Sequence, residues 1–271
     1  MARLTVHRVG SLEAPELAPY RTLRRPDEHE RAGLLVATNE KVVRRLLASR
    51  FTVLSVLLTP AWFEILKPDL SARPEDITVY LGEKELLETI TGYQLHQGVL
   101  ATARIPPSPD LETLLDSTPS PLLIVAVEGI ANAENLGTIV RSCAAFGVSF
   151  LIVGETCVSP LQRRAVSGSM GALFEQPTVR VNNLVATLGR LRARKIRCFA
   201  AHPRPDARQP SSVDLRDDCC LVFGAEGPGL SNPVLAACDE ALKIRMPSHM
   251  NSINVSAAAA VFLYEATQQR G

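Results

Sequence analysis

Leu122-Leu123-Ile124-Val125-Ala126-Val127 is an unbroken apolar run, typical of a strand whose two faces are both covered. Other apolar segments follow it, and segments with helical spacing of apolar residues lie between them. We expect the further strands at 150–153, 196–201, 220–223 and 242–244. We expect the helices near 136–146, 183–195, 232–238 and 254–268. This alternation predicts an α/β fold with a mostly parallel sheet and helices on both faces.

A proline-rich segment over residues 106–121 precedes the run. Its five prolines fix the backbone and cannot sustain a helix or a central strand, so we interpret it as a linker. The linker separates a first domain, 1–105, from a second domain, 122–271. The first domain is predicted to be a smaller α/β domain, with helices after Asn39 and over 83–91 and with strands at 33–37, 51–58, 77–81 and 97–105.

The composition is that of an ordinary globular protein, with 46% hydrophobic and 21% charged residues among 271. No apolar run approaches the roughly 18 residues that span a bilayer, and residues 1–8 lack the apolar core of a secretory signal. We therefore expect a cytoplasmic protein without membrane association. None of the six cysteines lies in a CxxC pair, so we expect no structural or catalytic metal.

The net charge of +1 excludes a uniformly basic nucleic-acid-binding surface. A nucleic-acid contact would therefore depend on local clusters of positive charge. The densest is residues 21–50, where eight Lys and Arg outnumber four Asp and Glu. This segment is either such a contact or the solvated face of helices, and the sequence leaves both interpretations open.

Three loops of the second domain carry polar residues after expected strands, where parallel sheets bind ligands. The first, 128–137, leads into a helix that places Arg141 one turn beyond Gly137, on the same face. A glycine there leaves room for a phosphate or ribose beside the guanidinium. Asn135 in the same loop is also suited to cap the helix.

The second loop is Phe223–Ser231 (FGAEGPGLS). Its glycines permit conformations and a close ligand approach that other residues forbid. Their spacing fits neither a P-loop nor the dinucleotide-binding fingerprint. A carboxylate held among glycines needs a partner, so we expect Glu226 to pair with an arginine, although a tight turn with an exposed glutamate is the alternative.

The third loop, Met246–Ser256, opens the last helix. Either Ser252 or Asn254 is a suitable N-cap, and the free amides of a helix start can also hold an anionic group. We interpret His249 as an incidental loop residue rather than a base.

Taken together, these loops closely resemble the signature motifs of the SpoU/TrmH family of RNA 2'-O-ribose methyltransferases. The matching segments are Asn135-x-Gly137-x-x-x-Arg141, Gly224–Ser231, and Ser252–Ser256 running into Leu263–Ala266. The first domain looks like the RNA-binding module of that family, a ribosomal-protein-like α/β fold, at 33–47 and 96–101. The third loop is shorter than is usual, and Ile253 stands where leucine is common.

The resemblance implies that the second domain is a trefoil-knot methyltransferase domain, that the chain forms a homodimer, and that its cofactor is S-adenosylmethionine. By position it implies cofactor contacts at Gly224, Gly227, Met246, Ile253 and Ser256. It also implies a ribose 2'-hydroxyl as acceptor, and therefore structured RNA rather than DNA as partner. The separate first domain favours ribosomal RNA over transfer RNA.

The resemblance further implies that Arg141 acts at the attacked hydroxyl. Because arginine is effectively always protonated, we interpret Arg141 as a clamp on the adjacent phosphate and a stabiliser of developing alkoxide. We expect Asn135 and Glu226 to hold its guanidinium. We expect Ser252 and Asn254 to contact the phosphate or the cofactor.

Four other functions remain open from the sequence. The first is a transfer RNA 2'-O-methyltransferase, and the second is a non-catalytic RNA-binding or ribosome-assembly protein. The third is a methyltransferase of the same fold that acts on a base. A dinucleotide-dependent oxidoreductase is disfavoured by the glycine spacing.

Overall fold

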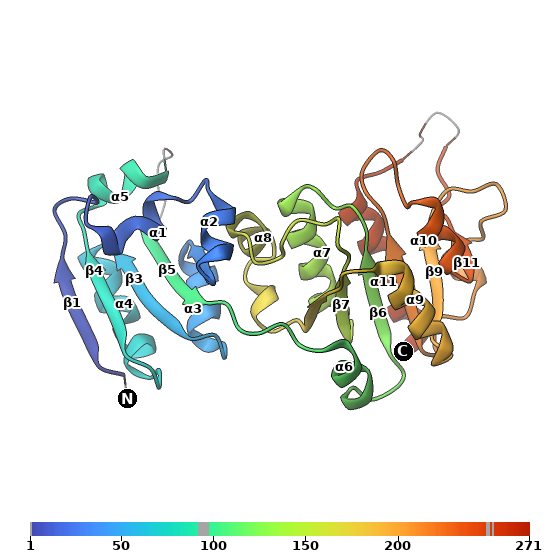
Figure 1. Ribbon diagram of the computed structural model, residues 1–271, viewed down its shortest axis with the longest axis horizontal. Helices are drawn as coiled ribbons and strands as arrows, with labels where there is room; N and C mark the ends of the chain where they lie inside the picture. Colours follow the sequence, from blue (N-terminus) through green and yellow to red (C-terminus); the bar gives the residue numbers. More distant parts are fainter. Residues whose placement is uncertain (1, 92–97, 248–249, 251) are drawn as a thin grey trace. The chain divides into compact units, whose positions relative to one another are not determined.

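The computed structural model describes residues 2–91, 98–247, 250 and 252–271. The chain forms two compact units, each with its own sheet (Figure 1). The first unit comprises Met1–Pro107 and Leu161–Glu175, and the second comprises Ser108–Pro160 and Gln176–Gly271. Within the described residues, no helix has the length and apolar character needed to cross a bilayer.

The first unit is built on a mixed five-stranded sheet with the order β1-β4-β3-β5-β2. Strands β1 and β3 run parallel to β4, whereas β5 runs antiparallel to β3 and β2. The strands are β1 (Leu4–Arg8), β2 (Leu34–Thr38), β3 (Val53–Leu58), β4 (Ile77–Leu81) and β5 (Val99–Arg104). The last four confirm the predicted strands, although Gln97 lies outside the described residues. Strand β1, a largely exposed edge strand, was not predicted.

Two of the helices of this unit follow directly from the sequence. Asn39 caps α3 by accepting a hydrogen bond from the Val42 amide at 3.0 Å, and the predicted apolar face of α3 is buried. Thr59 caps α4 in the same way, with Pro60 at the first helical position, where proline is tolerated. The helical segments are η1 (Pro15–Leu17), α1 (Ala18–Arg21), α2 (Pro26–Arg31), α3 (Glu40–Ala48), α4 (Pro60–Ser71), α5 (Lys84–Thr91), α8 (Arg163–Gly168) and η2 (Ala172–Phe174).

Most arginines of the basic segment 21–50 are held by neighbouring groups. Arg21 forms an ion pair with Glu13, and Arg25 forms one with Glu28. Arg44 pairs with both Glu40 and Asp69. The guanidiniums of Arg31 and Arg45 donate to the carbonyl oxygens of Asp27 and Met170. The exposed Arg24, Lys41 and Arg50 make no such contact with the described residues. These three are the cations of this segment that stay available to a partner.

A buried arginine, Arg73, fastens the end of α3 to the sheet. Its guanidinium donates to three carbonyl oxygens, those of Leu47, Ser49 and Phe51, at 2.7, 2.5 and 2.6 Å. It also donates to Glu75 Oε1 at 2.7 Å, and the same oxygen accepts from the Val53 amide at 2.7 Å. Burial favours a higher pKa for Glu75, but the bonds from Arg73 and Val53 outweigh it and lower that pKa.

Replacing Arg73 with methionine is expected to lower the free energy of unfolding by about 3 kcal/mol, because it leaves buried carbonyls and a carboxylate without their donor. Ionised Glu75 contributes its full share of the free energy of unfolding at pH values above the ordinary carboxyl pKa of about 4.3. This share is lost as the pH falls through the lower pKa that Glu75 has in the folded state. The variant should therefore lose less stability than wild type below that pH. Urea unfolding at neutral and acidic pH measures both effects. Arg216→Met, which removes an exposed pair with Asp214, is the control and should change little.

The second unit has a six-stranded sheet with the order β11-β9-β10-β6-β7-β8, in which every neighbouring pair is parallel. Its strands are β6 (Leu123–Val127), β7 (Phe150–Val153), β8 (Thr178–Arg180), β9 (Arg197–Ala201), β10 (Cys219–Phe223) and β11 (Glu240–Leu242). The chain builds β7 and β8 on one side of β6, and β10, β9 and β11 on the other. Ligands of open parallel sheets bind beyond the carboxyl ends of strands near such a reversal.

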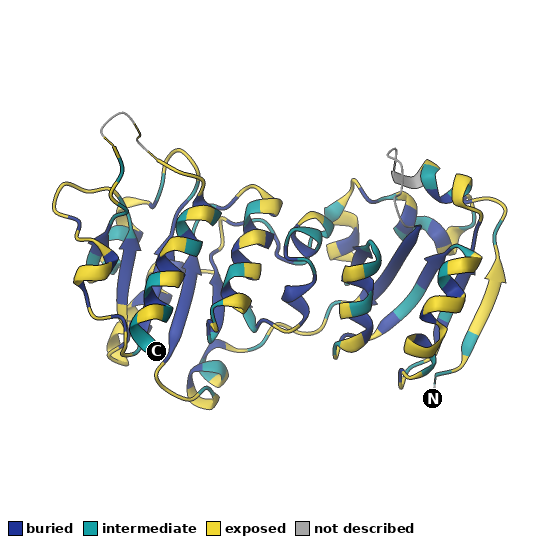
Figure 2. Cartoon of the chain, turned by 180° about the vertical axis from the view of Figure 1, so that it is seen from behind, coloured by how far each residue is buried: buried dark blue, intermediate teal, exposed yellow. Residues whose placement is uncertain are grey.

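Helices cover both faces of this sheet, as the sequence predicted, and leave their outer faces exposed (Figure 2). Alternate strand residues such as Ile124 and Phe150 pack in one core with Leu188 and Val234. On the other face α7 packs against α11, and the ring of Phe262 meets the ring of Phe223 edge-on at 5.5 Å. The helical segments are α6 (Leu111–Ser117), α7 (Ala133–Ala145), α9 (Leu184–Ala193), η3 (Pro210–Ser212), α10 (Asn232–Ala237) and α11 (Val255–Arg270).

The segment 106–121, expected to be a linker, contains helix α6. Asp110 caps this helix by accepting from the Thr113 amide at 3.0 Å, and Leu111 and Leu115 are buried in the core of the second unit. The prolines flank the helix rather than interrupt it, so their density does not prevent it from forming. Strand β8 and helices α1, α2, α4 and α8 were not predicted either.

Candidate functional site

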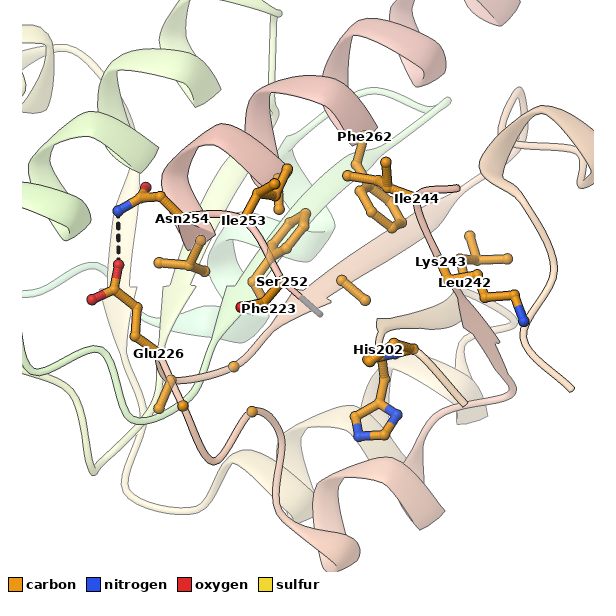
Figure 3. Close-up of a pocket in the computed structure, with 18 of the residues that line it drawn as sticks. His202, Phe223, Glu226, Leu242, Lys243, Ile244, Ser252, Ile253, Asn254 and Phe262 are labelled. Atoms are coloured by element: carbon orange, nitrogen blue, oxygen red, sulfur yellow. Dashed lines mark hydrogen bonds between the residues drawn. The ribbon is translucent and has the colours of Figure 1, made fainter. Parts of the chain in front are cut away.

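A cavity of about 500 Å³ lies beyond the carboxyl ends of β9, β10 and β11 (Figure 3). It is walled by the glycine-rich loop after β10, the segment after β11, and the start of α11. Its floor is apolar, with Phe223, Leu242, Ile244 and Phe262 among the lining residues. A cavity of this size with few polar side chains is typical of a site for a small organic ligand.

The glycine-rich loop is bent back tightly on itself. The amide and carbonyl of Ala225 exchange hydrogen bonds with those of Gly229 at 3.1 and 3.0 Å. A Cβ atom at Gly224 would lie 2.3 Å from the carbonyl carbon of Gly229, a separation that no side chain tolerates. Gly227 has a φ of +88°, in the left-handed region that favours glycine. The conformation of the loop therefore requires glycine at position 224 and favours it at position 227.

A carboxylate from the preceding loop anchors the far end of the glycine-rich loop. Glu128, directly after β6, accepts hydrogen bonds from the amide and hydroxyl of Ser231 at 2.8 and 2.7 Å. Ser231 in turn caps α10 by accepting from the Val234 amide. These contacts join the loop after β6 to the glycine-rich loop after β10.

Polar side chains from all three predicted loops meet at Glu226. Glu226 Oε1 accepts from Asn135 Nδ2 and from Asn254 Nδ2, both at 2.7 Å. Asn254 Nδ2 also approaches Asn135 Oδ1 at 3.1 Å. The structure thus brings together three residues that are more than 25 positions apart in sequence. Asn135 and Asn254 lie at the starts of α7 and α11, and Glu226 lies in the glycine-rich loop. We call this group the Glu226 cluster.

Arg141 lies outside the Glu226 cluster. It is exposed on α7, and its guanidinium makes no hydrogen bond or ion pair with the described residues. We had expected Asn135 and Glu226 to hold this guanidinium, but within one chain they bind each other and Asn254 instead. The cause is geometric, because Arg141 lies more than one helical turn beyond Asn135.

The predicted helix caps are partly corrected. Asn132, rather than Asn135, caps α7 by accepting from the amides of Glu134 and Asn135 at 2.8 and 3.3 Å. Of the two candidates for the last helix, Asn254 is the cap, accepting from the Ser256 amide at 2.9 Å. Asn135 is therefore free to direct its side-chain amide at Glu226.

The other predicted site residues lie around the cavity. Gly224, Gly227, Met246 and Ile253 line it, as does Ser252. Ser256 is not among the lining residues, and its hydroxyl donates to Asn254 Oδ1. His249 lies outside the described residues.

Several lining residues were missed from the sequence, notably His202, Lys243 and Phe262. The first two follow the carboxyl ends of β9 and β11. Because ligands of parallel sheets bind beyond such strand ends, both positions could have been predicted, but we considered only three loops. Phe262 shows no signal of its own, because one aromatic residue on a buried helix face is ordinary core.

The cysteines take no part in the site. All six are free and five are buried. Burial raises the pKa of the Cys157 and Cys219 thiols, which keeps them protonated. In the parts of the chain that the structure describes, no group of three or more His, Cys, Asp or Glu residues is arranged to hold a metal.

An all-parallel sheet with a cavity beyond its strand ends and a polar cluster beside it defines an α/β enzyme with a site for a nucleotide-sized ligand. Comparison with known proteins narrows this class. The chain belongs to the SpoU rRNA Methylase family, whose family model matches residues 122–264.

Relatives extend the similarity to the whole chain. An uncharacterized tRNA/rRNA methyltransferase of Mycobacterium bovis is 33% identical over 272 residues, covering 98% of this chain and 93% of its own. A 23S rRNA (guanosine-2'-O-)-methyltransferase RlmB of Xanthomonas campestris is 33% identical, covering 73% of this chain and 81% of its own.

Solved structures confirm the fold. The AdoMet-bound rRNA methyltransferase from Sinorhizobium meliloti matches with a TM-score of 0.83 at 22% identity, covering 97% of this chain and 98% of that one. The SpoU methyltransferase AviRb from Streptomyces viridochromogenes matches with a TM-score of 0.81 at 24% identity, covering 95% and 98%. Both likenesses span the two units.

Proposed function

We propose that this protein transfers a methyl group from S-adenosylmethionine to a ribose 2'-hydroxyl of ribosomal RNA. The observation that carries the proposal is the Glu226 cluster, which gathers one polar residue from each family motif at the edge of a ligand-sized cavity. Relatives named as 23S rRNA 2'-O-methyltransferases, 33% identical over most of this chain, support the acceptor.

The cavity fits the methyl donor. Its volume of about 500 Å³ and its apolar floor suit an adenosine group, and the tight turn that Gly224 permits forms one wall of the cavity. Gly224, Gly227, Met246 and Ile253 would hold the donor, with Ser256 next to them. When bound, S-adenosylmethionine supplies an electrophilic methyl group on a positively charged sulfur.

The residues of this chain then have to align the acceptor and release its proton. The ribose 2'-oxygen would form its bond to the methyl carbon as the carbon–sulfur bond breaks, the sulfur leaving as a neutral thioether and the 2'-proton passing to solvent water. Glu226 and Asn254 orient the ribose at the cavity edge, and Ser252 contacts the phosphate or donor. Arg141, always protonated, clamps the phosphate and stabilises negative charge on the 2'-oxygen.

The proposal includes a homodimer in which Arg141 of one subunit completes the cavity of the other. The absence of any Arg141 partner within the described part of one chain favours this arrangement. So do the exposed apolar side chains of α11, Val261 and Tyr264, which are 45% and 55% exposed. We further propose that the second unit contains the trefoil knot implied by the family resemblance.

The first unit is proposed to bind the RNA substrate. Arg24, Lys41 and Arg50 are its available cations in the segment 21–50 and supply phosphate contacts. We also propose a cytoplasmic location, which a ribosomal RNA substrate supports. A transfer RNA substrate is the alternative. Mapping of the 2'-O-methyl sites in cellular RNA distinguishes it from a ribosomal RNA substrate.

The proposed function is tested by donor binding and by product mapping. Calorimetry should detect binding of S-adenosylmethionine to the purified protein, and a protein without affinity for it is not a methyltransferase of this kind. Mapping 2'-O-methyl sites in cells with and without the gene should reveal one missing site in ribosomal RNA. A missing site in transfer RNA, or a methylated base in digested product, would replace the proposed acceptor.

A further inference from the structure

The imidazole of His202 lines the cavity with one nitrogen unsatisfied. Its Nδ1 is buried and has no hydrogen-bond partner among the described residues. Three other polar side chains of the cavity are engaged, since Glu226 binds Asn254, and Lys243 Nζ donates to the carbonyl oxygens of Arg204 and Pro205 at 3.2 and 3.0 Å. A buried nitrogen without a partner costs folding free energy, which a hydrogen bond to a ligand would offset.

Two walls of the cavity fix the position of this ring. The His202 amide donates to the Leu242 carbonyl at 3.0 Å, which ties the residue to β11. A Cβ at Gly229 would lie 3.8 Å from His202 Cδ2, so the ring lies against the glycine-rich loop. These contacts place the ring between β11 and the glycine-rich loop.

His202 lies across the cavity from the hydrogen bond between Glu226 and Asn254 (Figure 3). With the methyl group reacting beside Glu226, the imidazole of His202 contacts a part of the donor that is distant from this methyl group. The apolar residues on that side, Leu242, Ile244 and Phe262, suit a purine ring rather than a charged amino-acid group.

We propose that His202 Nδ1 hydrogen-bonds to the adenosine part of the methyl donor. The inference rests on the proposed function and adds a positioning residue that no motif indicated. An imidazole nitrogen accepts or donates according to its tautomer, and adenosine offers both hydroxyl and amino groups. Because the contact is remote from the methyl group, it strengthens donor binding and leaves the chemical step unchanged.

The test compares His202→Phe, which keeps ring bulk without the nitrogen, with His202→Asn, whose amide falls near the Nδ1 position. Calorimetry with S-adenosylmethionine and with methylthioadenosine, which lacks the amino-acid part, measures affinity. We expect His202→Phe to weaken both ligands about tenfold and His202→Asn to weaken them less than about threefold. His7→Phe, which changes an exposed histidine of β1, is the matched control and should alter neither affinity.

Thermal unfolding without ligand separates this role from a structural one. His202→Phe removes an unsatisfied nitrogen, so its Tm should equal or exceed that of wild type, and a clearly lower Tm would overturn the proposal. Unchanged affinity of His202→Phe for both ligands would also overturn it, and unchanged affinity for methylthioadenosine alone would reject the adenosine contact. Wild type that binds neither ligand would instead reject the proposed function.

Discussion

Replacing Arg141 with alanine is expected to lower kcat/KM for RNA methylation about a thousandfold and to leave the affinity for S-adenosylmethionine unchanged. The reason is that its guanidinium is exposed and unpaired within the described part of one chain, so the substitution leaves no buried partner unsatisfied. The lost interactions are those with the RNA phosphate and with developing charge on the 2'-oxygen. Single-turnover methylation of the mapped RNA and calorimetry with the donor measure the two effects.

Arg190→Ala is the control, because Arg190 is an exposed arginine on α9 that pairs only with Glu112 among the described residues. It should keep nearly full activity. Arg141→Lys should recover little, since an ammonium cannot form the bidentate phosphate contact. Near-normal turnover of Arg141→Ala would contradict the role that we assign to this residue.

Gly224→Ala should weaken donor binding by roughly a thousandfold. The new Cβ would meet backbone atoms of Gly229 and Leu230 at 2.3–2.6 Å, and a hydrogen-bonded backbone cannot yield as a flexible side chain does. The cost exceeds the roughly 3 kcal/mol of ordinary overpacking, because the loop must open and the cavity wall moves with it. Calorimetry with S-adenosylmethionine provides the measurement.

Gly189→Ala, the same substitution within α9, meets no atom within 4 Å and is the matched control. It should bind the donor like wild type and be slightly more stable, because alanine favours a helix more than glycine does. Donor affinity of Gly224→Ala within about tenfold of wild type would show that the loop does not form the donor site.

Mixing the two variants tests the shared cavity of the proposed dimer. If Arg141 acts across the interface, a heterodimer of Arg141→Ala and Gly224→Ala contains one complete site and regains activity. If Arg141 acts within its own chain, both sites stay defective and the mixture remains inactive. The result therefore decides the subunit origin of Arg141.

Several predicted elements that the structure confirms have a clear apolar pattern. Leu123–Val127 is buried on both faces, and α3 buries one full apolar face. Elements without such a pattern were missed. Strand β1 is an exposed edge, β8 has three residues, and α6 lies between prolines that suggested a linker.

The sequence by itself determined the α/β class, most strands, and the three loops whose residue types suit phosphate or ribose binding. Only the tertiary structure decided how those loops are used, because side-chain partners depend on distances between segments far apart in the chain. It pairs Glu226 with two asparagines rather than with Arg141, and it makes Asn132 the cap of α7. It also leaves His202 Nδ1 buried and without a partner among the residues that the structure describes, a property that arises only when β9, β11 and the glycine-rich loop pack together.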